Sequence, residues 1–260
     1  MAVVLAGGCR VSDMKEGLPQ TAGSLRIWHQ VGKNSGARAI SLRILEFGPG
    51  VSPVLRNREA DEVLYLLEHL DGHQDDRVCR LFLDGQAHEI TAQTGVYVRP
   101  GQTLTVDNPG PAPVQFISSL CPDSAAEDVT VPAVIERTSG ASTTKPSIVR
   151  LTDRKVVPTA DRWYRVLVDD EIGSRQVTQF VGSIPPGRAP DHYHQYEEVL
   201  FILRGSGRMW AGETNTPISA GSCIYLPKGQ VHCVENTGAD ELRLLGVFYP
   251  AGSPSVRYEA

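Results

Sequence analysis

Short stretches of the chain alternate between hydrophobic and polar residues with a period of two, as β-strands do. The clearest example is 38–47, where Ile40, Leu42 and Ile44 alternate with polar neighbours. This period is typical of a strand that is buried on one face. No segment carries a helical stripe longer than about two turns. The pattern therefore predicts an all-β protein.

Two segments, 62–67 and 198–203, are continuous apolar runs that open with a glutamate, and they predict fully buried strands. The other predicted strands are short and separated by turn residues, at 24–29, 78–83, 86–90, 95–98, 103–106, 114–120, 163–168, 176–184, 208–211, 221–226, 233–235 and 241–248. Many short strands at regular spacing indicate closed or sandwiched antiparallel sheets.

The predicted strands fall into two copies of one unit. Three pairs of segments align between the halves: 47–53 with 184–190, 62–67 with 198–203, and 96–102 with 223–230 after deletion of one residue. Glu62 and Glu198 are 136 positions apart, and the other pairs keep nearly the same spacing. A polar stretch at 70–77 has no counterpart in the second copy, so we expect an exposed loop there.

The repeat predicts two tandem domains, at 1–121 and 148–260. A chain of 260 residues is long enough for two domains that each bury a core. Between them, 122–147 is rich in Ser, Thr, Ala, Pro and acidic residues and has no sustained periodicity. We interpret this segment as a linker, with room for one added edge strand.

Candidate metal ligands gather in the second copy. His192 and His194 are two residues apart, so in an extended chain both imidazoles project from the same face. Glu198 opens the next apolar strand, and His232 follows a Pro-Lys-Gly turn. Three nitrogens and one oxygen suit a divalent transition ion of borderline softness, namely Fe, Mn, Ni, Co, Cu or Zn.

These segments resemble the paired motifs of the cupin superfamily. The matching positions are His192, His194, Glu198 and Gly205 in the first motif and Gly221, Pro227, Gly229, His232 and Asn236 in the second. Gly187 stands one residue closer to the first histidine than is usual. The resemblance implies a bicupin, with two double-stranded β-helix (jelly-roll) barrels and a metal held by His192, His194, Glu198 and His232. The alternative is a barrel that uses these histidines as hydrogen-bonded core residues.

The first copy lacks the ligand set. When the copies are aligned on Glu62, the positions of the three histidines are occupied by Arg56, Arg58 and Leu104. An arginine is permanently cationic and has no lone pair to give a metal, so we expect one ion per chain, in the second barrel. Arg56 or Arg58 could pair with Glu62 or receive an anionic group, and internal pairing is the favoured interpretation.

Composition and charge limit the kinds of binding partner and the location to be expected for this protein. Apolar residues make up 41% and charged residues 21% of the chain, as in a soluble globular protein. The net charge of -5 and the lack of clustered cations argue against nucleic acid. Five scattered cysteines indicate reduced thiols. We find neither a membrane span nor a signal sequence, so a cytoplasmic location is expected, and exposed sheet edges are compatible with a homodimer.

The resemblance implies an enzyme that acts on a small organic molecule, because the ion keeps positions open for water, dioxygen or substrate. The favoured class is a quercetinase-like dioxygenase, with iron as the favoured ion. The alternatives are a non-redox metal enzyme (isomerase, lyase or polyketide-type cyclase) and a small-molecule-binding module without turnover. Oxalate decarboxylation is disfavoured, since it resembles bicupins with metal in both halves.

One further polar residue is a candidate for the site. The strand before the histidines contains Thr178 and Gln179, and alternation sends only one of the two into the barrel. We favour Gln179 as the inward residue. The predicted catalytic groups are therefore Glu198 and Gln179.

Overall fold

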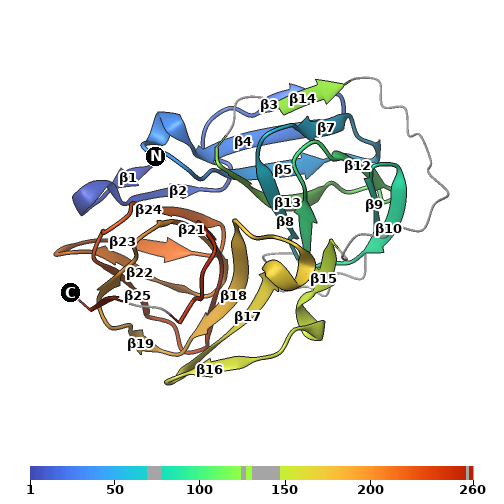
Figure 1. Ribbon diagram of the computed structural model, residues 1–260. Helices are drawn as coiled ribbons and strands as arrows, with labels where there is room; N and C mark the ends of the chain where they lie inside the picture. The colour runs from blue at the N-terminus through green and yellow to red at the C-terminus, as the bar shows by residue number, and fades with distance from the viewer. Residues whose placement is uncertain (69–77, 124–126, 131–146, 256–257, 260) are drawn as a thin grey trace.

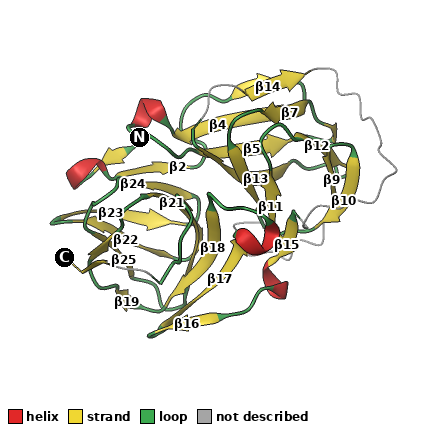
Figure 2. Ribbon diagram, viewed as in Figure 1, coloured by secondary structure: helices red, strands yellow, loops and turns green. Residues whose placement is uncertain are grey.

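The computed structural model describes residues 1–68, 78–123, 127–130, 147–255 and 258–259. These residues form four antiparallel sheets, which confirms the predicted all-β fold. Figure 2 shows strands joined by loops and a few helical turns. The helical turns are η1 (Ala6–Gly8), η2 (Lys33–Ser35), η3 (Leu151–Asp153) and η4 (Asp170–Ile172). The predicted loop at 70–77 and most of the predicted linker lie outside the described residues.

The first half of the chain supplies most strands of an N-terminal barrel made of two sheets. Its larger sheet contains, in spatial order, β15 (Ile148–Arg150), β11 (Thr94–Val98), β8 (Asp61–Leu66), β13 (Val114–Cys121), β5 (Leu42–Phe47), β4 (Leu25–Val31) and β3 (Gln20–Ala22). Its smaller sheet contains β10 (Gln86–Ile90), β9 (Cys79–Leu83), β12 (Thr103–Asn108), β7 (Val54–Asn57) and β14 (Glu127–Thr130), with β6 (Gly50–Val51) also pairing with β12. β14 is an added edge strand within the predicted linker.

The second half builds a C-terminal barrel in the same way. Its larger sheet contains β1 (Val3–Val4), β2 (Arg10–Asp13), β24 (Ser222–Leu226), β21 (Glu197–Arg204), β26 (Leu242–Tyr249), β18 (Thr178–Ile184), β17 (Arg162–Val168) and β16 (Val157–Thr159). Its smaller sheet contains β23 (Thr214–Ser219), β22 (Ser206–Ala211), β25 (His232–Asn236), β20 (His192–Tyr193) and β27 (Tyr258–Glu259), with β19 (Gly187–Arg188) also pairing with β25.

The strand orders of the two barrels are equivalent. The order β11-β8-β13-β5-β4-β3 in one corresponds to β24-β21-β26-β18-β17-β16 in the other, and β10-β9-β12-β7 corresponds to β23-β22-β25-β20. Two tandem barrels of one topology are what the sequence repeat predicts.

A strand near the start of each unit pairs with a sheet of the other unit. β2 pairs with β24 in the C-terminal barrel, and β15 pairs with β11 in the N-terminal barrel. Figure 1 shows β1 and β2, in blue, against the orange β24. The predicted domains, 1–121 and 148–260, therefore do not coincide with the two barrels. Residues 3–13 belong to a sheet of the C-terminal barrel, and residues 148–150 belong to a sheet of the N-terminal barrel.

The structure has three hydrophobic cores, one inside each barrel and a third that the two barrels share. Alternation along β8 points Leu64 into the N-terminal barrel and Val63 into a core shared by both barrels. Along β21, Leu200 faces the C-terminal barrel and Val199 faces the shared core. Each large sheet is therefore apolar on both faces, which explains the continuous apolar runs in the sequence.

A buried ion pair lies inside the N-terminal barrel. One guanidinium nitrogen of Arg43 is 2.7 Å from the Glu62 carboxylate, and the two side chains are only 2% and 3% exposed. The Ser118 hydroxyl accepts hydrogen bonds from Arg43 and donates one of 2.5 Å to Glu62. Because Arg43, Ser118 and Glu62 lie on the neighbouring strands β5, β13 and β8, the carboxylate is neutralised from within the barrel.

The predicted pairing of Glu62 with Arg56 or Arg58 is wrong. Arg56 donates to the carbonyl of Gly101 at 2.8 Å, and Arg58 pairs with Asp128 at 2.9 Å. Both arginines are exposed, so neither enters the barrel.

Replacing Arg43 with alanine is expected to lower the free energy of unfolding by about 3–5 kcal/mol, because the Glu62 carboxylate would stay buried without a cation. Urea denaturation followed by circular dichroism measures the change. The exposed Arg56→Ala in the same barrel is the control and should shift it by less than about 0.5 kcal/mol. Equal, small shifts in both variants would contradict the importance of the buried pair.

Candidate metal centre

The predicted ligands converge in the C-terminal barrel. His192 on β20 lies opposite His232 on β25 in the antiparallel register. His194 lies in the loop between β20 and β21, and Glu198 is the second residue of β21. The loop and the turn before His232 are joined because the Gly229 N–H donates to the His194 carbonyl at 2.8 Å. Gly229 has a φ of 79°, in the left-handed region that favours glycine.

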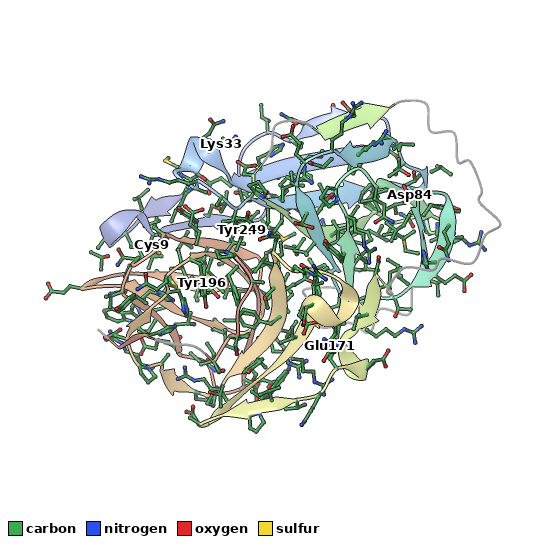
Figure 3. All side chains as sticks on the ribbon, viewed as in Figure 1. Cys9, Lys33, Asp84, Glu171, Tyr196 and Tyr249 are labelled. Carbon is green, nitrogen blue, oxygen red and sulfur yellow. The ribbon has the colours of Figure 1, made fainter. Side chains whose placement is uncertain are left out.

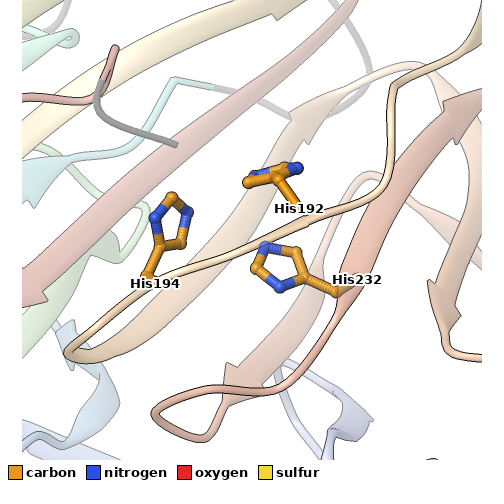
Figure 4. A group of neighbouring side chains, drawn as sticks. All are labelled: His192, His194 and His232. Atoms are coloured by element: carbon orange, nitrogen blue, oxygen red, sulfur yellow. The ribbon is translucent and has the colours of Figure 1, made fainter. Parts of the chain in front are cut away.

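The three imidazoles form a compact group. Each offers one nitrogen, and these nitrogens all lie within 4.8 Å of one another. Figure 4 shows the rings of His192, His194 and His232 turned toward a common space. In the described part of the chain, this is the one group of three or more His, Cys, Asp or Glu side chains close enough to hold an ion.

Backbone carbonyls orient two of the rings. The Nδ1 atoms of His192 and His232 lie 3.0 and 2.8 Å from the carbonyl oxygens of Pro190 and Gln230. A carbonyl only accepts, so each Nδ1 carries the proton and each Nε2 keeps its lone pair. This outer hydrogen bond is typical of metal-binding histidines, so the two rings fit a ligand role.

Glu198 and the third imidazole complete the set. The Oε2 of Glu198 is 3.4 Å from the Nε2 of His194. Tyr196, labelled in Figure 3, stacks on His194 with an interplanar angle of 8° and on Phe248 with an angle of 21°. Aromatic packing thus supports the ring of His194 from one side.

Burial favours the uncharged forms of Glu198 and His232 in the absence of an ion. It raises the pKa of Glu198 to about 8. Burial and, to a smaller extent, the neighbouring His192 together lower the pKa of His232 to about 4. The imidazole of His232 is therefore neutral at physiological pH, as a metal ligand has to be, and the carboxyl group is ready to exchange a proton for a cation.

The four predicted ligands line a cavity of about 680 Å³, counting the part that is open to solvent. Its other lining residues are Thr159, Arg162, Trp163, Tyr164, Phe180, Gly182, Ser183, Ile184, Ala189, Leu200, Val234, Leu244 and Pro254. The wall is mostly apolar, and Arg162 is the cation that lines it. The side chain of Arg162 is 14% exposed and pairs with Asp161 at 3.3 Å.

Gln179 does not face this cavity, which corrects the expected direction of its side chain. Phe180 and Gly182 line the cavity, so the alternation of β18 turns Gln179 to the opposite face. Its Oε1 lies 3.0 Å from the place that a Cβ would take on Gly95 of the N-terminal barrel. Gln179 is therefore buried between the barrels, away from the imidazoles.

Sequence reasoning missed Arg162, Tyr164 and Phe180 as cavity residues. They lie on β17 and β18, before the motif, and nothing in the spacing indicates which face of those strands turns inward. Phe180 faces the cavity beside Gly246, where its ring atoms come within 2.3 Å of the place a Cβ would take. Gly246, which pairs with Phe180 on the neighbouring strand, was thus the sequence signal that could have indicated a large inward side chain at position 180.

A β-barrel whose paired motifs bring three histidines and a glutamate to one interior defines a class of metal-binding proteins. Residues 180–248 match the family model for a cupin domain. This part of the chain is a cupin domain, and the chain as a whole has the two-barrel fold of a bicupin.

Curated relatives cover part of the chain. Auxin-binding protein 1 of Arabidopsis thaliana is 35% identical over 83 residues, which are 28% of this chain and 42% of that protein. An oxalate-binding protein of Thermotoga maritima is 36% identical over 66 residues, which are 25% of this chain and 54% of that protein. The chain thus spans about half the length of the curated relatives it matches. A relationship to quercetinases stays a prediction.

Solved structures share the fold over nearly the whole chain. Oxalate decarboxylase of Bacillus subtilis at pH 4.6 has a TM-score of 0.73 and 12% identity, covering 92% of this chain and 76% of that one. A further oxalate decarboxylase structure, described under the substrate binding mode of that enzyme, has a TM-score of 0.72 at 12% identity, covering 94% of this chain and 77% of that one. At 12% sequence identity, this similarity shows a shared fold. Among the described residues, no helix has the length and apolar character that a membrane crossing requires.

Replacing His192 or His232 with alanine is expected to abolish metal occupancy, because each change removes one nitrogen of a three-imidazole group. Metal analysis of purified protein is the measurement, with about one ion per wild-type chain expected. Arg56→Ala and the exposed His29→Ala, both in the N-terminal barrel, are controls that should keep the ion. Two ions per chain would contradict the assignment.

Metal affinity is expected to rise with pH up to about 8, by roughly tenfold per unit, because binding displaces the proton that Glu198 keeps below its raised pKa. His232 adds nothing to this slope above about pH 4. Calorimetry in buffers of different ionisation enthalpy should show release of about one proton per ion near neutral pH. Glu198→Gln should remove that release, and an affinity that is flat with pH would refute the coupling.

Proposed function

We propose that the C-terminal barrel is a metal-dependent active site for a small organic molecule, holding one divalent transition ion through His192, His194, Glu198 and His232. The observation that carries the proposal is a group of three imidazoles, two of them oriented by backbone carbonyls, at the side of an apolar cavity. Bound there, such an ion supplies Lewis acidity and, if it is iron or another redox-active metal, electrons.

The cavity favours a substrate with an apolar body and one anionic oxygen. Phe180, Leu200 and Leu244 provide an apolar wall, which lowers the free energy of a bound hydrocarbon or aromatic group. Arg162 offers donors suited to a carboxylate or enolate. Two of the similar proteins are named for oxalate, a small organic anion, which supports an anionic ligand.

Dioxygenation is the reaction class that this lining supports best. Apart from the four proposed ligands, the described residues of the lining include no carboxylate, imidazole, amine or thiol. Among these residues the cavity therefore has no separate side chain that would act as a general base. Tyr164 adds only a phenol. A substrate that is already acidic, such as an enol, needs no such base, and an apolar wall admits dioxygen.

A second candidate, a binding module without turnover, is favoured by one observation. Both curated relatives with significant similarity are named as binding proteins. The same site would then retain an organic anion beside the ion and release it unchanged.

Oxygen consumption separates these functions. The iron-loaded wild-type protein, offered a flavonol or a 1,3-diketone as a representative enolisable substrate, is expected to consume dioxygen, because an acidic enol needs no base. His232→Ala should consume none, and His29→Ala should behave as the wild type. Product formed equally fast without dioxygen would assign a lyase, isomerase or cyclase instead. Binding without product under either atmosphere would assign a binding module.

A further inference from the structure

Two neighbouring carboxylates at the start of β21 point to opposite sides of the sheet. Glu198 lines the metal cavity, so alternation turns Glu197 toward the N-terminal barrel. The Glu197 residue is nevertheless only 8% exposed. A carboxylate buried at this junction needs hydrogen-bond donors around it.

Those donors come from both barrels. The N–H groups of Arg38 and Ala39 donate to the Glu197 carboxylate at 2.9 and 2.7 Å. The Tyr225 hydroxyl donates to it at 2.7 Å. Arg38 and Ala39 lie in the N-terminal barrel between η2 and β5, whereas Tyr225 lies on β24 of the C-terminal barrel.

The hydrogen bonds of Glu197 involve both segments that carry proposed metal ligands, the one with His194 and Glu198 and the one that leads to His232. Glu197 stands between His194 and Glu198 in the chain, and the strand of Tyr225 leads through the turn at 227–229 to His232. The Gly229 N–H donates to the carbonyl of His194, so the two segments are also joined to each other. A shift of the 36–39 loop would therefore be transmitted to both.

We propose that Glu197 is a positioning residue, through which the N-terminal barrel holds the ligand-bearing segments of the C-terminal barrel in place. The proposal rests on the metal centre proposed above. Three donors on one buried carboxylate fix its position, because each charge-assisted bond is short and costly to break in the interior. Hydrogen bonds that orient metal ligands commonly change metal affinity about 10-fold to 100-fold. We expect an effect in this range for Glu197, which acts on the ligands through the backbone segments that carry them. The N-terminal barrel then has a structural role in metal binding without holding the ion.

The test is cobalt(II) binding to the full chain, followed by visible absorption and chelator competition. Glu197→Gln replaces one accepting oxygen with a donor, and its Kd for cobalt is expected to rise about 10-fold to 100-fold, with altered absorption bands. The control is Glu235→Gln. Glu235 lies three residues after His232 and accepts a bond of 2.8 Å from Trp210 of its own barrel. It forms no hydrogen bond or ion pair with the described residues of the N-terminal barrel, so the Kd of this variant should stay within about twofold.

A second variant covers the case in which Glu197→Gln does not fold. Tyr225→Phe keeps the ring and removes one donor, so its Kd should rise about 10-fold, the lower end of that range. A lowered melting temperature with a wild-type cobalt Kd and spectrum, in Tyr225→Phe and in Glu197→Gln if that variant folds, would show a merely structural role and overturn this inference alone. Failure of the wild-type chain to bind cobalt would overturn the metal centre and the inference together.

Discussion

A carboxylate buried inside each barrel requires a positive charge or a proton beside it, and the two barrels meet this requirement differently. In the N-terminal barrel, Arg43 and Ser118 satisfy Glu62. Phe180 faces Gly246 in the C-terminal barrel at the register where Arg43 faces Ser118. Without that arginine, Glu198 shares its interior with three imidazoles. One fold thus contains a built-in cation in one copy and a site for an external cation in the other.

The two barrels form one structural unit. They share a hydrophobic core, and each completes a sheet of the other through β2 or β15. The bonds of Glu197 to Arg38 and Ala39 add a polar connection directly behind the ligands. A barrel without the histidine motif can therefore support the function of its neighbour by fixing where the ligand strands begin.

The sequence predicted the strands, the repeat and the convergence of His192, His194, His232 and Glu198, because these follow from local period and from motif spacing. It could not predict the contacts that depend on which face of a strand turns inward. Gln179 and Phe180 differ by one position, and one position reverses the face. Arg43 was missed because it reaches Glu62 across an intervening strand. The exchange of β2 and β15 was missed because edge pairing depends on tertiary packing rather than on local pattern.

The most direct test of the central claim is a crystal structure of the protein grown with manganese or cobalt, with anomalous scattering data collected at the absorption edge of the metal. The account predicts one anomalous peak per chain, bounded by His192, His194, His232 and Glu198. It also predicts no peak beside Arg43 and Glu62. A peak in the N-terminal barrel, or an empty C-terminal site at saturating metal, would contradict it.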